Sequence, residues 1–301
     1  MQWLLRLLAA LPVSLSYGVA WLAFVMLFYV FRYRRGTVQE NLEHAFPLLS
    51  KAERGSIERE SYRHFCNLFM EIIRSTTMEQ EEFRDRITFT NLELLQDATD
   101  NYEKQAIVLL IHQGNWEWML HSAMAHMPVS VDPVYKALHN PFWDQFMLNA
   151  RSRFGATPMT IDNIGREVIR GRRRKRIIAM LADQAGPKLG GYWTDFLHRP
   201  ASFYRGADKL AQTLSLPVMF AECIRTATGR YEVTFHTISA PPHSEDGEKI
   251  LSAYVRRAEH AISEQPETYL WTNRRWKKPP PQEYLASISK SSPAEISKES
   301  S

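Results

Sequence analysis

The chain has 301 residues, of which 45% are hydrophobic and 23% are charged. Such a chain can bury a large core in one large domain or two smaller ones, and its composition excludes wholesale disorder and collagen-like repeats. The mean hydropathy of −0.34 is too low for a polytopic membrane protein. Lys and Arg exceed Asp and Glu by 37 − 33 = 4, a surplus that allows an acidic partner without requiring one. Two cysteines, Cys66 and Cys223, are too few for a disulfide framework or a cysteine-rich metal site.

The first distinctive feature is an uncharged apolar segment at residues 7–31. A helix over this segment is roughly 37 Å long, against about 30 Å for the hydrocarbon core of a bilayer. Arg32, Arg34 and Arg35 follow it, and only Arg6 precedes it, so the positive-inside rule predicts that the rest of the chain is cytoplasmic. We therefore expect residues 1–35 to be a transmembrane or membrane-anchoring helix. A signal peptide, or an interfacial helix broken at Pro12, remains an alternative.

The segment after the apolar run has helical periodicity. Residues 37–46 place Val38, Leu42 and Phe46 on one face, and Pro47 ends the pattern. A longer helix is predicted over residues 51–74, with Ser50 as its N-cap. An acidic stretch at 78–86 and an amphipathic segment around residues 92–95 follow.

From Ala106 onward, short β-branched apolar runs alternate with segments of helical spacing. Strands are predicted at residues 106–112, 129–137, 157–161, 176–184, 216–225 and 231–239. Helices are predicted at residues 116–127, 140–155, 163–176, 202–215 and 248–265. This alternation predicts an α/β fold, in which a mixed, largely parallel sheet is flanked by helices behind the N-terminal anchoring helix. We assign residues 36–285 to this domain and expect the Ser/Lys/Glu-rich residues 286–301 to be a disordered tail.

His112 ends the first buried strand, and Glu117 lies in the first turn of the helix that follows. Chemistry in an open α/β sheet is found at the carboxyl ends of strands. Gly114 permits a tight bend, and Asn115 is a suitable N-cap. If Glu117 holds one imidazole nitrogen of His112, the other can take a proton from a hydroxyl, which then attacks an acyl carbonyl directly. A purely structural histidine fits the same spacing.

Five sequence blocks, in this order, resemble those of one protein family. They are RRGTVQENLEHAFP, HQGNWEW, YKALHNPFWDQFMLNARSRFG, LADQAG and PETYLWTNRRWKKPP. Together they cover about residues 35–277, and the chain resembles the bacterial lipid A biosynthesis acyltransferases. These are a branch of the glycerolipid and lysophospholipid acyltransferases, whose motif is His-x4-Asp or Glu. The chain departs from the family at Phe196-Leu197-His198, where Phe-Phe-Gly is usual, and at Asn273, where His is frequent.

The resemblance implies a glycerolipid acyltransferase-like fold and a set of site residues. His112 would be the general base and Glu117 its orienting partner. The other residues that it places at the site would bind substrate: Asn115, Arg151, Arg153, Asp183 and Gln184. The two arginines would hold an acceptor phosphate or the developing oxyanion, since guanidinium groups bind phosphate in bidentate fashion.

The implied activity is transfer of a fatty acyl chain from acyl carrier protein, or from acyl-CoA, to a hydroxyl of a lipid A precursor. The implied location is the bacterial inner membrane, with the catalytic domain on the cytoplasmic side. We expect no cofactor, metal or nucleic acid, because neither a ligand spacing nor a nucleic-acid-binding motif is present.

Two basic runs, at residues 166–176 and 274–278, suit anionic lipid head groups or an acidic carrier protein, although a solvated surface would look the same. Four tryptophans could belong to the core or to an acyl-chain groove: Trp116, Trp118, Trp143 and Trp193. His121 and His126 are interpreted as packing residues.

Three other functions remain open from the sequence. The first is the same chemistry on a lysophospholipid or an amino-acid lipid. The second is a thioesterase in which His112 activates water. The third is a non-catalytic lipid-binding membrane protein.

Overall fold

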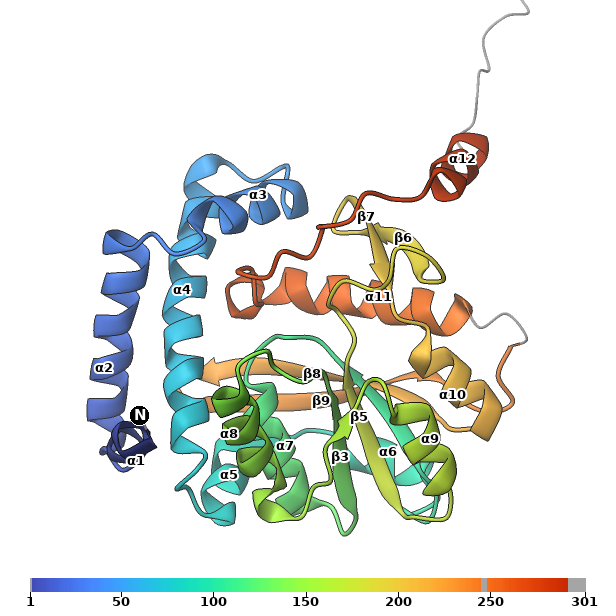
Figure 1. The fold of residues 1–301 in the computed structure, drawn as a ribbon, viewed down its shortest axis with the longest axis horizontal. Coiled ribbons are helices and arrows are strands. Elements are labelled where there is room, and N and C mark those ends of the chain that lie inside the picture. Colours follow the sequence, from blue (N-terminus) through green and yellow to red (C-terminus); the bar gives the residue numbers. More distant parts are fainter. Residues whose placement is uncertain (1, 245–247, 292–301) are drawn as a thin grey trace, which may run out of the picture.

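The computed structural model describes residues 2–244 and 248–291, and its centre is a mixed, mostly parallel sheet (Figure 1). The sheet has seven strands in the order β1-β9-β8-β2-β5-β3-β4, with β8 and β9 antiparallel and the other neighbours parallel. Its strands are β1 (Ile87–Phe89), β2 (Ala106–Leu110), β3 (Ser130–Tyr135), β4 (Met159–Thr160), β5 (Arg176–Leu181), β8 (Val218–Ala227) and β9 (Arg230–Ser239). The antiparallel pair β6 (Tyr192–Phe196) and β7 (Arg199–Phe203) is separate. The predicted α/β class is confirmed.

Helices cover both faces of the sheet, and the N-terminal helices lie to one side of it (Figure 1). They are α1 (Gln2–Ala9), α2 (Val13–Val25), α3 (Arg35–Ala45), α4 (Lys51–Arg74), α5 (Gln80–Arg86), α6 (Leu92–Ala98), α7 (Trp116–His126), α8 (Pro141–Arg151), α9 (Ile164–Arg170), α10 (Gly206–Leu214), α11 (Glu248–Glu264) and α12 (Gln282–Ser291). The π-helix η1 (Met26–Val30) continues α2, and short 3-10 turns cover η2 (Ser152–Phe154) and η3 (Pro266–Thr268).

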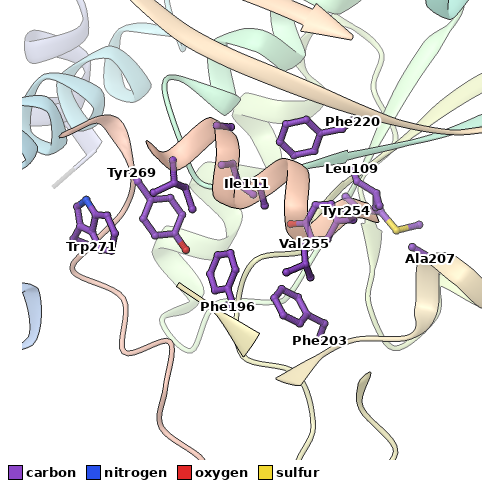
Figure 2. Packing of buried hydrophobic residues seen from close by; sticks show 14 of the residues in the cluster. Leu109, Ile111, Phe196, Phe203, Ala207, Phe220, Tyr254, Val255, Tyr269 and Trp271 are labelled. Carbon is purple, nitrogen blue, oxygen red and sulfur yellow. The ribbon is translucent and has the colours of Figure 1, made fainter. Parts of the chain in front are cut away.

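The strands are buried on both faces because α7 and α11 lie on opposite sides of them. Along β2, Val108 and Leu110 pack in a cluster with α7, whereas Ile107 and Leu109 pack with α11. Figure 2 shows the second cluster, in which side chains of the β6–β7 hairpin and α11 meet Tyr269 and Trp271. These two residues belong to the stretch between α11 and α12, residues 265–278, which is called the final segment below. Burial on both faces explains why β2 is a continuous apolar run without alternation.

The N-terminal apolar segment is two helices and not one. Helix α1 ends at Ala9, and α2 begins after Pro12, which lacks the backbone N–H that a helix interior requires. Val13–Val30 is the one described stretch that is long and apolar enough to cross a membrane, judged by length and composition only. One flank of α2 packs along α4 (Figure 1), while Leu15, Trp21 and Leu22 are exposed.

Several elements differ from the predictions. The predicted helix 202–215 begins only at Gly206, because residues 199–203 pair with β6 in a hairpin that turns at Leu197 and His198. The predicted helix 163–176 ends at Arg170, and β1 was not predicted. Helix α12 continues to Ser291, so the first part of the predicted tail is helical; residues 292–301 lie outside the described residues.

Helix α2 is joined to α4 by a hydrogen bond that predicts a stability effect. The Tyr17 hydroxyl donates to Glu71 Oε1 over 2.7 Å, and the Glu71 carboxyl group is 1% exposed. Tyr17→Phe leaves that oxygen without this donor, so we expect the free energy of unfolding in detergent to fall by about 1–3 kcal/mol. Tyr29→Phe is the control, because its ring lies on the exposed side of the same segment. Equal stability of the two variants would contradict the prediction.

Candidate functional site

The candidate site is centred on His112, whose partner is Asp183. The imidazole Nδ1–H donates to Asp183 Oδ1 over 2.7 Å. Residues Leu110 and Leu181 are register partners in the parallel strands β2 and β5, and each functional residue follows two positions later. Burial would raise the pKa of Asp183, but the charge and hydrogen bonds of His112 outweigh it and hold this pKa below its usual range. Asp183 therefore presents an ionised carboxylate to the imidazole.

Gln184 contacts the other nitrogen of the same ring. With Nδ1 protonated, His112 Nε2 is an acceptor, and the Gln184 side-chain amide donates to it over 3.2 Å. Nε2 faces the large cavity that both residues line. In the tautomer that Asp183 favours, Nε2 is therefore unprotonated, and its contact with protein is the hydrogen bond from the uncharged Gln184 amide.

Glu117 does not hold His112, which corrects the expected pairing. Its two carboxylate oxygens accept hydrogen bonds from Arg151 Nε, over 2.9 Å, and from Arg151 Nη2, over 2.5 Å. Trp116 Nε1 also donates to it over 3.1 Å. Burial acts to raise the pKa of Glu117, but the charge and hydrogen bonds of Arg151 lower it overall. The carboxylate is fully used in joining α7 to the end of α8.

Asn115 and Arg153 are also occupied by the fold. The Asn115 side chain is 0% exposed; its Oδ1 accepts from Trp118 N over 2.8 Å, as predicted for an N-cap, and its Nδ2 donates to Glu71 Oε2 over 2.7 Å. Arg153 donates to the carbonyl oxygens of Ser75 and Met78. Neither residue lines the cavity. The structure gives both a structural position where substrate binding was expected.

Two segments hold the turn that carries His112. The final segment pairs with it: Leu270 N donates to His112 O over 2.9 Å, and Gly114 N donates to Thr268 O over 3.2 Å. Helix α4 supports it from another side, because His64 Nε2 donates to Gly114 O over 3.1 Å. Burial lowers the pKa of His64 to about 3, so this ring is neutral.

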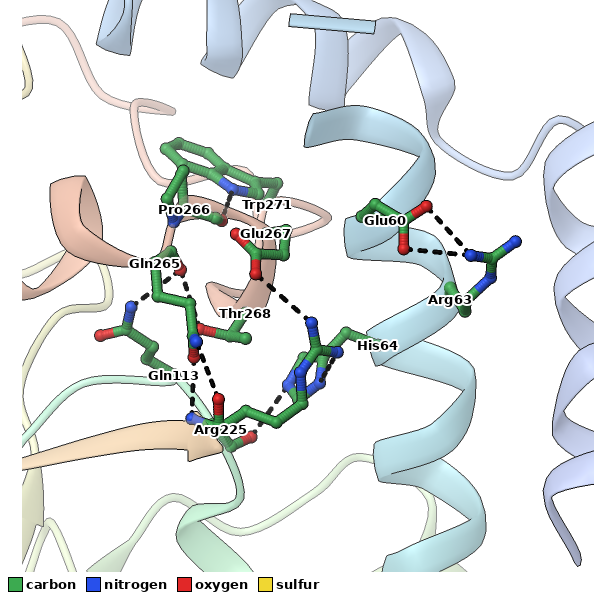
Figure 3. A network of polar contacts seen from close by, with 11 residues as sticks. Glu60, Arg63, His64, Gln113, Arg225, Gln265, Pro266, Glu267, Thr268 and Trp271 are labelled. Atoms are coloured by element: carbon green, nitrogen blue, oxygen red, sulfur yellow. Dashed lines mark hydrogen bonds and ion pairs between the residues drawn. The ribbon is translucent and has the colours of Figure 1, made fainter. Parts of the chain in front are cut away.

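Figure 3 shows how this support extends to β8. Arg225 reaches Nδ1 of His64 over 3.3 Å and Glu267 over 3.3 Å. Its backbone exchanges hydrogen bonds with the Gln265 side chain, and Gln113 Nε2 donates to the carbonyl oxygen of Gln265. Gln113, the residue next to His112, is therefore hydrogen-bonded to Gln265, which also holds the backbone of Arg225.

The cavity has a volume of about 750 Å³ and two chemically different regions. Apolar side chains between the sheet and α7 line one region: Val108, Leu110, Leu120, Ala123, Met127, Val131, Ile177 and Phe235. Polar and charged side chains line the other, among them His112, Gln184, Lys136, Arg274 and Lys277. A ligand with an apolar chain and a polar, charged end fits this division.

The four tryptophans have different surroundings. Trp116 lines the cavity and meets His112 edge to face, with ring centroids 4.9 Å apart. Trp118 is a buried core residue whose indole N–H donates to Glu71 O. Trp143 packs with Phe146, and Trp193 packs with Tyr284. Among the four, only Trp116 lines the cavity.

The sequence did not predict the pairing of His112 with Asp183, although a signal for it is present. Each residue lies at the end of a predicted buried strand, and parallel neighbours end at the same edge of a sheet. Nothing in the sequence, however, marks these two strands as neighbours.

The backbone at Gly114 generates a prediction. Gly114 has φ +63°, and a Cβ built there would lie 2.6 Å from Cys223 O and 2.7 Å from Cys223 Sγ. Gly114→Ala therefore combines an unfavourable backbone conformation with a steric clash, and we expect about 2 kcal/mol or more of destabilisation together with loss of activity. Gly55→Ala, in open space on α4, is the control and should be neutral or slightly stabilising. Thermal unfolding measures both, and a stable, active Gly114→Ala variant would contradict the prediction.

His121 predicts a pH dependence of stability. It is buried between Phe83 and Phe154, and burial lowers its pKa to about 4 from 6.5. Because the unfolded chain binds the proton more readily, stability is lost as the pH falls from 6.5 toward 4, by up to about 3 kcal/mol from this group. His121→Leu should show a smaller loss than wild type over that window when unfolding is measured at each pH. The exposed His139→Gln is the control, and parallel curves for His121→Leu and wild type would contradict the assignment.

The chain matches the family of bacterial lipid A biosynthesis acyltransferases over residues 2–278. Because the match covers nearly the whole chain, the protein belongs to this family. The family implies acyltransferase activity with an acyl donor and a lipid acceptor. A comparison with individual curated proteins finds no match.

Proposed function

We propose that this member of the lipid A biosynthesis acyltransferases moves a fatty acyl chain from a thioester donor, acyl carrier protein, to a hydroxyl group of a lipid A precursor. The observation that carries the proposal is the His112–Asp183 pair, in which His112 lines the 750 Å³ cavity and its second imidazole nitrogen is contacted by Gln184, another lining residue. We further propose that the enzyme is anchored in the inner membrane by its N-terminal segment and faces the cytoplasm.

In the proposed reaction His112 is the general base. The acceptor hydroxyl displaces the Gln184 amide from Nε2, gives its proton to that nitrogen, and its oxygen forms a bond to the thioester carbonyl carbon. The tetrahedral intermediate collapses by breaking the carbon–sulfur bond. The imidazolium returns the proton to the departing thiolate, so an ester and a free thiol leave the site. Each proton and electron pair is accounted for without a cofactor.

Asp183 acts through His112 as a positioning residue. Its carboxylate fixes the Nδ1–H tautomer and stabilises the imidazolium while the hydroxyl proton is on the ring, as the aspartate does in serine-protease triads. The low pKa of Asp183 supports this role, because the group stays ionised throughout the neutral range.

The N-terminus of α7 is suited to the negative charge that develops on the carbonyl oxygen. Trp116, the first residue of that helix, packs against the His112 ring, so the positive end of the helix dipole lies beside the imidazole. Arg151 adds charge on the same wall but is paired with Glu117, which neutralises most of it. We propose that Glu117 serves by holding α7 to α8, which keeps this helix end in place.

The apolar region of the cavity supports a fatty acyl substrate. It is lined by β-branched and aliphatic side chains from the sheet and from α7, with no ion pair among them. Burying a methylene group there contributes about 0.8 kcal/mol, so several methylenes bind a long chain firmly.

Two substitutions test the mechanism. His112→Ala removes the base, and we expect transfer to fall below detection while the protein stays folded. Asp183→Asn keeps the shape but not the charge, and we expect kcat to fall by about 10²–10⁴-fold with little change in KM. Acyl transfer from a radiolabelled carrier thioester to a lipid A precursor measures both values.

The product analysis decides between the proposal and its rivals. Acylated lipid A precursor supports the proposal; free fatty acid alone indicates a thioesterase, and mass spectrometry of cellular lipids identifies any other acceptor. Thr234→Ala is the control and should keep full transfer. The Thr234 hydroxyl contacts Thr90 at the β1–β9 edge of the sheet and does not line the cavity. Full transfer by His112→Ala would contradict the mechanism.

A further inference from the structure

Three cationic side chains line the same cavity as His112 and are not used by the fold. Lys136 follows β3, and Arg274 and Lys277 lie in the final segment. All three are exposed, and none has an ion pair or side-chain hydrogen bond in the part of the chain that the structure describes. Arg151, the fourth cation of the lining, is paired with Glu117. The three unpaired cations are therefore available to a ligand.

Arg274 and Lys277 are exposed at the cavity, whereas the two residues between them are held by the fold. Arg275, between them, is 3% exposed; its guanidinium lies 4.4 Å from the Phe203 ring centroid and donates to Ser202 O over 2.8 Å. Trp276 stacks on Phe196. Because these two residues are held by the fold, the backbone that carries Arg274 and Lys277 is fixed beside the cavity.

The final segment lies beside the residues that follow the apolar N-terminal stretch. Arg34, directly after the apolar N-terminal stretch, donates to Thr272 O over 3.0 Å. Asn41 of α3 donates to Trp271 O over 2.8 Å and to Asn273 O over 3.0 Å. Figure 1 shows α3 at the same end of the molecule as this segment. Arg274 therefore follows a stretch of chain that is hydrogen-bonded to the residues directly after the apolar N-terminal segment.

The charge balance of the cavity favours an anion. Glu117 and Arg151 neutralise each other, and two further carboxylates, Asp144 and Asp162, line the cavity. Asp144 Oδ1 accepts from Leu138 N over 2.8 Å. Three unpaired cations against two carboxylates leave a net charge of 3 − 2 = +1, excluding the histidines.

We propose that Lys136, Arg274 and Lys277 form a binding site for a phosphate monoester or diester of the substrate. This inference rests on the proposed function, because a lipid A precursor and the phosphopantetheine arm of a carrier protein both carry phosphate. It assigns phosphate binding to these three residues in place of Arg151 and Arg153. Arg151 is paired with Glu117, and Arg153 donates to backbone carbonyl oxygens. The source is either the acceptor or the donor, and the experiment distinguishes them.

The test measures binding, so it does not depend on catalysis. The first probe is a diphosphorylated disaccharide lipid in detergent micelles, compared with the same lipid after phosphatase treatment. The second probe is phosphopantetheine, compared with pantetheine. The variant K136Q/R274Q/K277Q should raise Kd for a phosphorylated probe at least about 10-fold, the effect of losing charge-assisted hydrogen bonds, and should change Kd for its dephosphorylated form less than about twofold.

The control R166Q/R170Q/R172Q removes the same charge from exposed positions outside the cavity and should bind like wild type. Weakened binding of the lipid assigns the site to the acceptor, and weakened binding of phosphopantetheine assigns it to the donor. Unchanged Kd values for both probes, or an equal loss in the control, would overturn the proposal. His112→Ala that binds normally but transfers nothing separates the site from the chemistry; normal phosphate binding without any transfer by wild type would instead contradict the proposed function.

Discussion

The parallel pairing of β2 with β5 is the constraint on which the rest of the site depends. It sets Leu110 opposite Leu181 and so brings the residues that follow, His112 and Asp183, within 2.7 Å. The backbone hydrogen bonds of two buried strands position both, and the final segment adds a third edge through Leu270 N and His112 O. Preorganisation of this kind lowers the cost of reaching the transition state.

Around that pair, charged groups are divided between structure and function. Glu117 with Arg151, and Asp132 with Arg176, are buried ion pairs that join elements to one another. Removing one partner of such a pair is costly, because the other charge is then buried without a counter-charge or water. Three other cations, Lys136, Arg274 and Lys277, line the cavity without a partner among the described residues. Both arginines of the Arg-x-Arg block are engaged by protein groups, although their type and position in the sequence suggested phosphate binding.

Much of the fold was predictable because it depends on local patterns. The helix with a capping box at Ser50, the buried run at β2 and the N-cap at Asn115 were all expected, and each is determined within a few residues. The choice between Glu117 and Asp183 as partner of His112 was not local. It depends on which strands are neighbours and on Arg151, which lies 34 positions after Glu117 and occupies it. The β6–β7 hairpin was missed for a local reason: its strands are only five residues long, and β7 contains Pro200, a residue that is unfavourable in strands.

Glu71 gives the N-terminal helix a role in the integrity of the domain. Its buried carboxyl group accepts hydrogen bonds from Tyr17 of α2, from Asn115 beside the turn that carries His112 and from Tyr231 of β9. Burial raises the pKa of this group, and each of the three hydrogen bonds acts to lower it. The three donors therefore replace hydrogen bonds that an exposed carboxyl group makes to water. A shortened chain that starts after residue 31, the usual route to a soluble preparation, would lose one of these donors and uncover the flank of α4. Biochemical work on this enzyme should therefore begin from the full-length chain in detergent or in lipid discs.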